Sequence, residues 1–253
     1  MKILRSLALT GLALALLTGP ARAQTDPLAL EIIDEFDRMM RGESSAGLMR
    51  MEIDTENWSR ALEMRIWSLG TEHSLVRVET PAREAGTATL MVDNEVWNYL
   101  PNVDRTIKVP PSMMLGSWMG SHFTNDDLVK ESRLIEDYDI VISHEGPRDG
   151  EDVWEFTLTP KPDAPVIWGR IEQQIRKRDR MPIWARYYDE DGSLVRTMSF
   201  SDFGVLGGRT LPARMVMEPT DGEERTVVIY LELEFDVGLA EDFFSLRNLR
   251  ARR

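Results

Sequence analysis

Residues 226–235 read Thr-Val-Val-Ile-Tyr-Leu-Glu-Leu-Glu-Phe, and this stretch decides the fold class. Apolar side chains stand at every second position from Val227 to Phe235, and residues such as Glu232 lie between them. A period of two places one set of side chains on one face of a β-strand and the other set on the opposite face. The stretch therefore predicts a strand in a sheet with one buried face.

The same alternation recurs along most of the chain. The other predicted strands cover residues 49–54, 62–66, 75–78, 87–92, 95–100, 105–109, 139–143, 153–159, 170–177, 182–188, 193–200 and 213–218. Turn-forming pairs such as Asp191-Gly192 separate several of them, and short connections imply antiparallel pairing. A sheet of about ten or more strands curls, splits or closes. We therefore predict a mainly β (α+β) fold built on a single, strongly curved antiparallel sheet.

One helix is predicted before the sheet begins. Asp26 suits its N-cap, Pro27 its first helical position, and Gly42 the position just past its end. Apolar side chains recur at helical spacing between these limits, namely Leu28, Ile32, Phe36 and Met40. Such a stripe indicates that the helix lies on an apolar surface, which we expect to be the concave face of the sheet.

Residues 110–133 interrupt the strand pattern. They neither alternate nor form a regular helix as far as Phe123, and Thr124 or Asn125 can cap a short helix that follows. Five large apolar side chains are spread along this segment: Met113, Met114, Leu115, Trp118 and Met119. Two interpretations are open. Residues 110–123 form either a lid that moves over an apolar ligand or a fixed plug in the core of the sheet.

Residues 1–23 have the features of a secretory signal peptide. A basic start is followed by an uncharged run over residues 7–17, and residues 21–23 (Ala-Arg-Ala) match the small-x-small cleavage pattern. The alternative is an N-terminal anchor helix, but the run is shorter than the roughly 20 residues that span a bilayer. We expect cleavage, a periplasmic location, and a single domain over residues 24–253.

The composition excludes several kinds of partner and chemistry. Asp and Glu number 43 against 30 Lys and Arg, so the net charge is −13, and the chain has no cysteine. An acidic chain repels the phosphates of nucleic acids and an anionic membrane surface. The absence of cysteine removes disulfides, thiolate metal sites and cysteine nucleophiles. We expect no nucleic-acid partner.

No constellation of residues typical of an enzyme is found in the sequence. His73, His122 and His144 are far apart and lack metal-ligand spacing. The sequence contains no phosphate-binding loop and no nucleophile elbow. We therefore predict a non-enzymatic protein without metal or cofactor. The competing hypothesis of a lipid-acting enzyme would depend on His122.

A sheet of this size needs more cover than the predicted helix, the 110–133 segment and residues 240–249 provide. We expect an apolar cavity to remain on its concave face, and an apolar ligand such as a lipid to fill it. The candidate ligand-binding residues are Trp67, Trp97, Tyr99, Met113, Met114, Leu115, Trp118, Met119 and Phe123. Arg105 is the candidate for a polar contact with the lid or with a headgroup. Taken singly, each tryptophan is equally consistent with a filled core, and Arg105 with an ion pair at the rim.

Several of these segments together resemble a known family. The matching stretches are 96–101, 105–109, 112–123, 126–128, 187–192, 196–200, Pro212 and 242–249. Their residues and order are similar to those of the outer membrane lipoprotein-sorting protein family, which is related to the LolA-like periplasmic carriers. The resemblance implies a half-open antiparallel barrel, covered by helices and a loop, that shields acyl chains in the periplasm. It also implies an association of some members with exporters of the resistance-nodulation-division (RND) type.

Two functional hypotheses follow for this chain. In the first, it is a carrier that binds the acyl chains of a lipid or a lipidated protein and moves it towards the outer membrane. In the second, it is an accessory or sensor subunit of an RND-type exporter with a filled core and no cargo of its own.

Overall fold

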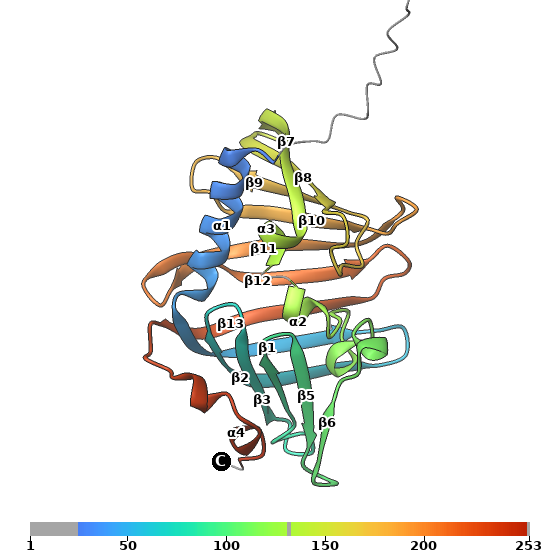
Figure 1. Ribbon diagram of the computed structural model, residues 1–253, viewed down its shortest axis with the longest axis vertical. Coiled ribbons are helices and arrows are strands. Elements are labelled where there is room, and N and C mark those ends of the chain that lie inside the picture. The colour runs from blue at the N-terminus through green and yellow to red at the C-terminus, as the bar shows by residue number, and fades with distance from the viewer. Residues whose placement is uncertain (1–24, 131–132, 252–253) are drawn as a thin grey trace, which may run out of the picture.

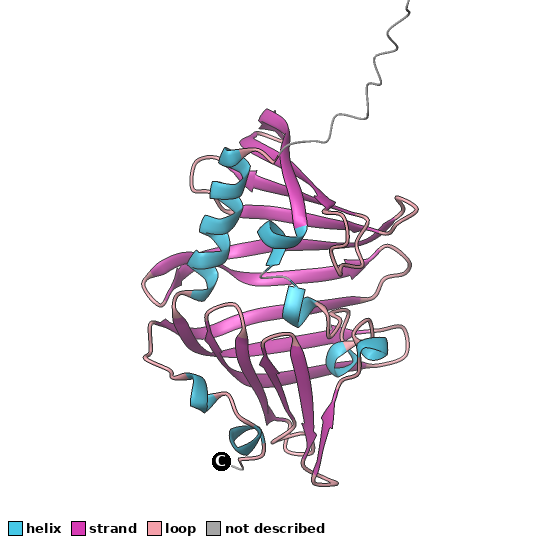
Figure 2. Cartoon of the chain, in the orientation of Figure 1, coloured by secondary structure: helices cyan, strands magenta, loops and turns pink. Residues whose placement is uncertain are grey.

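The computed structural model describes residues 25–130 and 133–251 of the chain. In this part of the chain the strands form one antiparallel, curved and unclosed sheet in the order β6-β5-β4-β3-β2-β1-β13-β12-β11-β10-β9-β8-β7 (Figures 1 and 2). The strands are β1 (Ser44–Asp54), β2 (Ser59–Leu69), β3 (His73–Thr80), β4 (Ala88–Val92), β5 (Glu95–Leu100), β6 (Arg105–Lys108), β7 (Tyr138–Arg148), β8 (Glu151–Pro160), β9 (Arg170–Arg176), β10 (Pro182–Tyr188), β11 (Leu194–Leu206), β12 (Arg209–Pro219) and β13 (Arg225–Phe235). The predicted fold class, a half-open β-barrel, is confirmed.

The order of the strands explains the long irregular segment in the middle of the chain. Strands that follow one another in sequence are neighbours in the sheet, except that β6 and β7 lie at its two opposite edges. The chain must therefore cross the whole sheet between Lys108 and Tyr138. It does so on the side of the sheet where α1 also lies, which we call the concave face (Figure 1). We call residues 110–130 the crossing segment.

The predicted first helix is confirmed as α1 (Pro27–Arg41). The Asp26 carboxylate accepts a hydrogen bond from the Leu28 N–H at 2.9 Å, and Gly42 ends the helix with a positive φ of 66°. Its buried side chains Ile32 and Ile33 pack into a cluster that spans β7 to β12. The helix therefore covers one half of the concave face.

The crossing segment covers much of the other half and has little regular structure. It contains two short 3₁₀ turns, η1 (Pro111–Met113) and η2 (Trp118–Gly120), followed by the one-turn helix α2 (Asp127–Lys130). Thr124 caps α2 as predicted, because its hydroxyl accepts from the Asp127 N–H while the Asp127 carboxylate accepts from the Thr124 N–H. A second short helix, α3 (Leu134–Asp137), leads into β7.

The end of the chain lies on the opposite, convex face. Its two short elements are η4 (Glu241–Phe243) and α4 (Leu246–Leu249). Phe244 and Leu249 are buried there against Leu75, Leu90 and other side chains of β3 to β5. These three strands therefore have apolar cover on both faces.

A glycine marks the centre of the sheet, where the first and last strands pair. Gly47 lies in β1 beside an irregularity in the register with β13, between Leu48 and Met49. A Cβ atom at Gly47 would lie 2.5 Å from the Glu232 carbonyl oxygen, which is closer than atoms approach without displacement. The close approach of the two strands at this bend therefore requires glycine.

The predicted signal peptide, residues 1–23, lies outside the described residues. Among the helices that the structure does describe, none is long and apolar enough to span a bilayer.

Candidate functional site

The concave face of β1, β2, β3 and β13 is an apolar wall. Register places Met64 of β2 opposite Met49 of β1 and opposite Val78 of β3, so their side chains point to the same side. The buried members of this wall are Met49, Met51, Ile53, Leu62, Met64, Val76, Val78 and Val228. Because four of them are flexible methionine or leucine side chains, the wall can adapt to partners of different shape.

Apolar side chains of the crossing segment fill the space above this wall. Trp118 is 4% exposed and packs into the wall cluster, with Met119, Phe123 and Leu128 beside it. The Trp118 indole Nε1–H donates to the Thr89 hydroxyl at 3.1 Å, so the only polar atom of the indole is satisfied. Met114 packs nearby against Met91, Val96 and Val109. The segment thus covers the wall with apolar side chains of its own.

Polar contacts tie the crossing segment to one rim of the sheet, where β2 begins and β12 ends. Arg60 of β2 donates to the Met119 carbonyl oxygen. The His122 Nδ1 lies 2.8 Å from the Thr226 hydroxyl, and its Nε2 lies 3.2 Å from Glu224 Oε2. The His122 backbone N–H also donates to Thr226 at 3.0 Å. We call the contacts of His122 with Thr226 and Glu224 the clasp.

A buried ion pair holds the end of the crossing segment. Arg196 of β11 binds both carboxylate oxygens of Asp127, at 2.8 Å for the Nη1–Oδ2 contact. Arg196 also donates to the His122 carbonyl oxygen at 3.1 Å. The Trp168 and Tyr187 rings each lie 4.5 Å from its guanidinium carbon. A planar cation beside two aromatic rings and a carboxylate is well stabilised, but loss of the carboxylate would be costly at this buried site.

Two pKa shifts are found around these contacts. The Glu56 backbone N–H, and then the His122 ring, lower the pKa of Glu224, because both interactions stabilise the carboxylate. Burial, and then the charge of Asp137, raise the pKa of Tyr138 far above its ordinary value. The phenol of Tyr138 is therefore held neutral beside the acidic end of the crossing segment.

The structure divides the predicted ligand-binding residues between the two faces of the sheet. Met114, Trp118, Met119 and Phe123 lie together over the concave wall. Met113 and Leu115 belong to the same segment but point outward, with 59% and 57% of their surfaces exposed. Of the predicted ligand-binding residues, only members of the crossing segment therefore lie over the concave wall.

Trp67, Trp97 and Tyr99 do not face the crossing segment, so the grouping of these three residues with it was wrong. They contribute to the cluster on the convex face, where the Trp67 and Phe243 ring centroids lie 5.7 Å apart. The reason is the parity of the strands. Thr89, which binds Trp118, pairs with Asn98, and Asn98 points to the opposite side from both of its neighbours, Trp97 and Tyr99.

Arg105 lies at the start of the edge strand β6 and is exposed. It pairs in register with Leu100, at the end of β5 that is distant from Val96 and Met114. A contact of Arg105 with the lid or with a headgroup therefore stays a prediction.

Sequence reasoning missed the polar residues that hold the crossing segment, chiefly Arg60, Arg196 and Thr226. They are isolated charged or polar residues at positions of the strand pattern that otherwise hold apolar side chains, as in Arg196-Thr-Met198. That interruption was the available signal. A charged residue at a buried strand position requires a partner, and here the partners come from the crossing segment.

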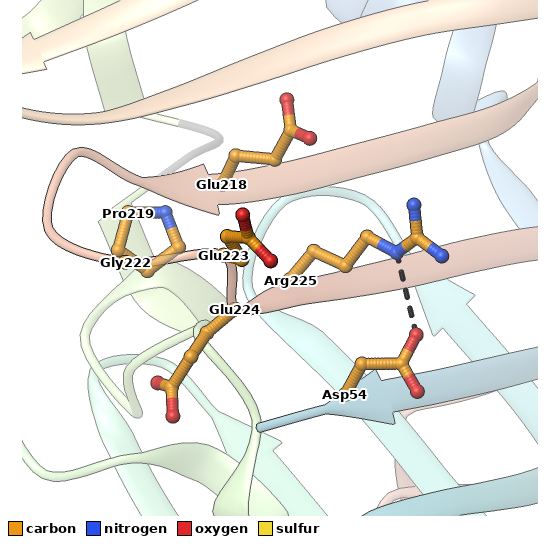
Figure 3. Close-up of a pocket in the computed structure, with 7 residues that line it drawn as sticks. All are labelled: Asp54, Glu218, Pro219, Gly222, Glu223, Glu224 and Arg225. Atoms are coloured by element: carbon orange, nitrogen blue, oxygen red, sulfur yellow. Dashed lines mark hydrogen bonds and ion pairs between the residues drawn. The ribbon is translucent and has the colours of Figure 1, made fainter. Parts of the chain in front are cut away.

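The two pockets described in the structure lie away from the apolar wall. The first has a volume of about 630 Å³ and is lined by Asp54, Glu218, Pro219, Gly222, Glu223, Glu224 and Arg225 (Figure 3). The second is lined by Arg38, Gly42, Glu43, Arg209 and Asp236. Both lie at strand ends, and most of the residues that line them are charged. Within the described residues, the wall itself is packed against the crossing segment.

The three histidines lie on different elements, on β3, in the crossing segment and on β7. Among the described residues no group of three or more His, Asp and Glu side chains is arranged to hold a metal ion.

Comparison with known proteins places this geometry in context. A protein-family model described as "Uncharacterized protein" matches residues 70–251. A DUF1329 family protein from Desulfovibrio piger has a TM-score of 0.80 and 24% identity, with 89% of this chain and 100% of that chain covered. No curated protein sequence matches the chain.

Two further solved structures have the same fold. A domain assigned to the outer membrane lipoprotein-sorting proteins, from Vibrio parahaemolyticus, has a TM-score of 0.77 and 23% identity, covering 88% of this chain and 99% of that one. A LolA superfamily protein from Nitrosomonas europaea has a TM-score of 0.73 and 22% identity, covering 87% of this chain and 98% of that one. At these identities the likeness establishes a shared fold.

Proposed function

Because the chain belongs to the family matched over residues 70–251 and has the fold of LolA superfamily and lipoprotein-sorting domains, we propose that it is a non-enzymatic periplasmic carrier. In this proposal the concave wall holds the acyl chains of a lipid or of a lipidated protein. The crossing segment is the lid, and the chain moves its cargo towards the outer membrane. The relatives named above give no support to an accessory role beside an RND-type exporter.

One observation carries the proposal: an apolar wall is covered by an irregular segment instead of by a helix or a second sheet. The apolar side chains of Trp118, Met119 and Phe123 can leave the wall without breaking any pairing between strands of the sheet. An acyl chain can then take their place. Each buried methylene contributes about 0.8 kcal/mol, so the wall can compensate for much of the cost of desorbing such a chain from a membrane.

The contacts that hold the segment are suited to reversible closure. They are hydrogen bonds and ion pairs at the rim, from Arg60, His122 and Arg196. The hydrogen bonds of Arg60 and His122 each contribute modestly in exchange with water, and the apolar contacts beneath are non-directional. The buried Arg196–Asp127 pair is costly to break unless another acceptor replaces the carboxylate. A ligand that supplies equivalent apolar contacts and such an acceptor can therefore displace the segment at a small net change in free energy.

The test is acyl-chain binding by the purified protein. We expect lipid to co-purify with protein prepared from its native periplasm, as detected by native mass spectrometry, and a fluorescent fatty acid to bind after delipidation. Phe123→Ser in the lid should tighten that binding, because the lid then competes less well for the wall. Leu231→Ser, at a site on β13 that is 40% exposed, is the matched control and should leave binding unchanged.

Absence of co-purified lipid together with absence of fatty-acid uptake would contradict the carrier function. Unchanged binding in Phe123→Ser would show that the ligand does not compete with the crossing segment.

A further inference from the structure

Two guanidinium groups face the concave side at the rim where the lid is fastened. Arg60 pairs in register with Ile53, and Ile53 pairs with Thr226, so all three side chains share the concave face. Arg196 is two positions from Met198, a member of the concave core, and therefore shares that face as well. The apolar wall of the site thus begins directly beneath two cations.

Both guanidinium groups donate hydrogen bonds to acceptors in the lid itself. Arg60 donates to the Met119 carbonyl, and Arg196 to the Asp127 carboxylate and the His122 carbonyl. Only 24% of the Arg60 side chain and 5% of the Arg196 side chain are exposed. When the lid lifts, these acceptors leave together. Arg196 then loses the carboxylate of Asp127, and the loss of an anionic partner at a poorly solvated site is strongly unfavourable, so a replacement anion is favoured there.

The nearby carboxylates do not neutralise this inner side of the rim. Asp54 and Glu218 alternate with the concave-facing Ile53 and Met217, so they face the convex side. Glu224 lies in the β12–β13 connection and already accepts from the Glu56 N–H and contacts His122. Glu84 remains beside Arg60 at 3.3 Å after lid opening, whereas Arg196 loses the carboxylate of Asp127. The inner rim is therefore cationic in a protein that is acidic overall.

We propose that the ligand of this site is an amphiphile with an anionic headgroup, a carboxylate or a phosphate. The headgroup takes the place of the Asp127 carboxylate on Arg196 and of the Met119 carbonyl on Arg60. The acyl chain lies along the wall formed by Ile53, Met51 and Met49. This inference rests on the proposed carrier function and narrows its ligands. A neutral acyl-chain ligand would supply no anion to replace the Asp127 carboxylate on Arg196, whereas Arg60 keeps Glu84 nearby.

The test compares pairs of ligands whose hydrocarbon chains have the same length, one member with an anionic headgroup and the other with a neutral headgroup. The carboxylate arm measures palmitate against hexadecanol, and the phosphate arm measures palmitoyl lysophosphatidate against monopalmitoylglycerol. Binding to the delipidated full chain is followed by displacement of a fluorescent fatty acid. We expect the anionic member of at least one pair to bind about tenfold more tightly than its neutral partner, and the pair that does so identifies the headgroup.

Substitutions at the ion pair should change this preference in opposite directions. Arg196→Met removes the cation, and the preference should fall below about threefold. Asp127→Asn removes the competing carboxylate and leaves the cation, so the preference should increase. A merely structural ion pair would loosen the lid in both variants and shift both members of a ligand pair alike. Arg65→Gln, at a convex-face pair with Glu79, is the matched control.

Arg60→Gln gives a second, independent measurement in case Arg196→Met does not fold. Equal affinity for charged and neutral ligands, or a preference that survives in both arginine variants, would overturn the inference and leave the carrier function standing. Failure of every acyl ligand to bind would overturn the carrier function and the inference with it.

Discussion

At the residue scale, two tryptophans differ in how much they contribute to the stability of the fold: one within the crossing segment and one next to it. Trp118 belongs to the segment and is buried between it and the wall. Trp58 lies in the β1–β2 connection, where 44% of its surface is exposed, close to Gly120. Residue type alone does not separate them. What separates them is whether a strand face lies beneath the ring.

Trp118→Ala should lower the free energy of unfolding by about 3–5 kcal/mol, because it leaves a large cavity above the wall and removes the hydrogen bond to Thr89. Trp58→Ala should lower it by no more than about 0.5 kcal/mol. Chemical denaturation of the two variants checks the contrast. Equal losses would mean that the crossing segment is not docked on the wall.

Glu224 makes the clasp sensitive to acid. Its pKa is lowered in the folded protein, so its contribution to stability is complete above its ordinary pKa of 4.5 and is lost as the pH falls through the folded value. We expect the environment of Trp118, followed by fluorescence, to change in this range before the sheet unfolds. Glu224→Gln should remove that step, and Glu223→Gln should retain it.

At the scale of elements, β3 to β5 carry apolar clusters on both of their faces. The crossing segment covers one face and the C-terminal segment, residues 237–251, covers the other. Arg77, on the same face as Leu75, donates to the Asn248 carbonyl oxygen and so fastens α4 to the strands. The C-terminal segment is therefore part of the fold of this region and not an appendage.

Truncation after Asp236 should expose the convex cluster around Leu75, Leu90 and Tyr99 and cause self-association. Truncation after Arg250 retains the buried Leu249. The oligomeric state of this variant should therefore be the same as that of the full chain. Size-exclusion chromatography with a dye that binds apolar surface distinguishes the two. Normal behaviour of the shorter chain would show that the cluster is covered by other side chains.

Periodicity predicted the strands and α1 correctly because each repeat is local. It also placed Trp97 and Tyr99 on one face of β5. It did not identify which face meets the crossing segment, because that depends on the order of strands and on the route between β6 and β7. Arg196 was missed for the same reason: its partner Asp127 lies 69 residues away and belongs to no motif.

At the scale of the whole molecule, the concave face has two kinds of cover. Over β7 to β12 the cover is the capped, 15-residue helix α1. Over β1 to β3 and β13 it is a chain of short turns held by side-chain contacts at the rim. The first is expected to stay in place when the second opens, because local opening follows the elements with the fewest cooperative contacts.

Native-state hydrogen exchange tests this difference. Amides of residues 113–127 should exchange faster than those of the central turns of α1, and an acyl ligand should change the exchange of the crossing segment more than that of the helix. Equal protection in the two covers would identify the crossing segment as a fixed plug.

The curvature of the concave face depends in part on Gly47, where β1 and β13 pair at the centre of the sheet. At Gly47 the first and last strands approach so closely that a methyl group would meet the Glu232 carbonyl oxygen and the Leu233 side chain. Any other residue there would force β1 and β13 apart and alter the curvature that the two halves of the sheet share. The spacing of β1 and β13 at the centre of the sheet, and with it the curvature of the concave face, therefore requires a residue without a side chain at position 47.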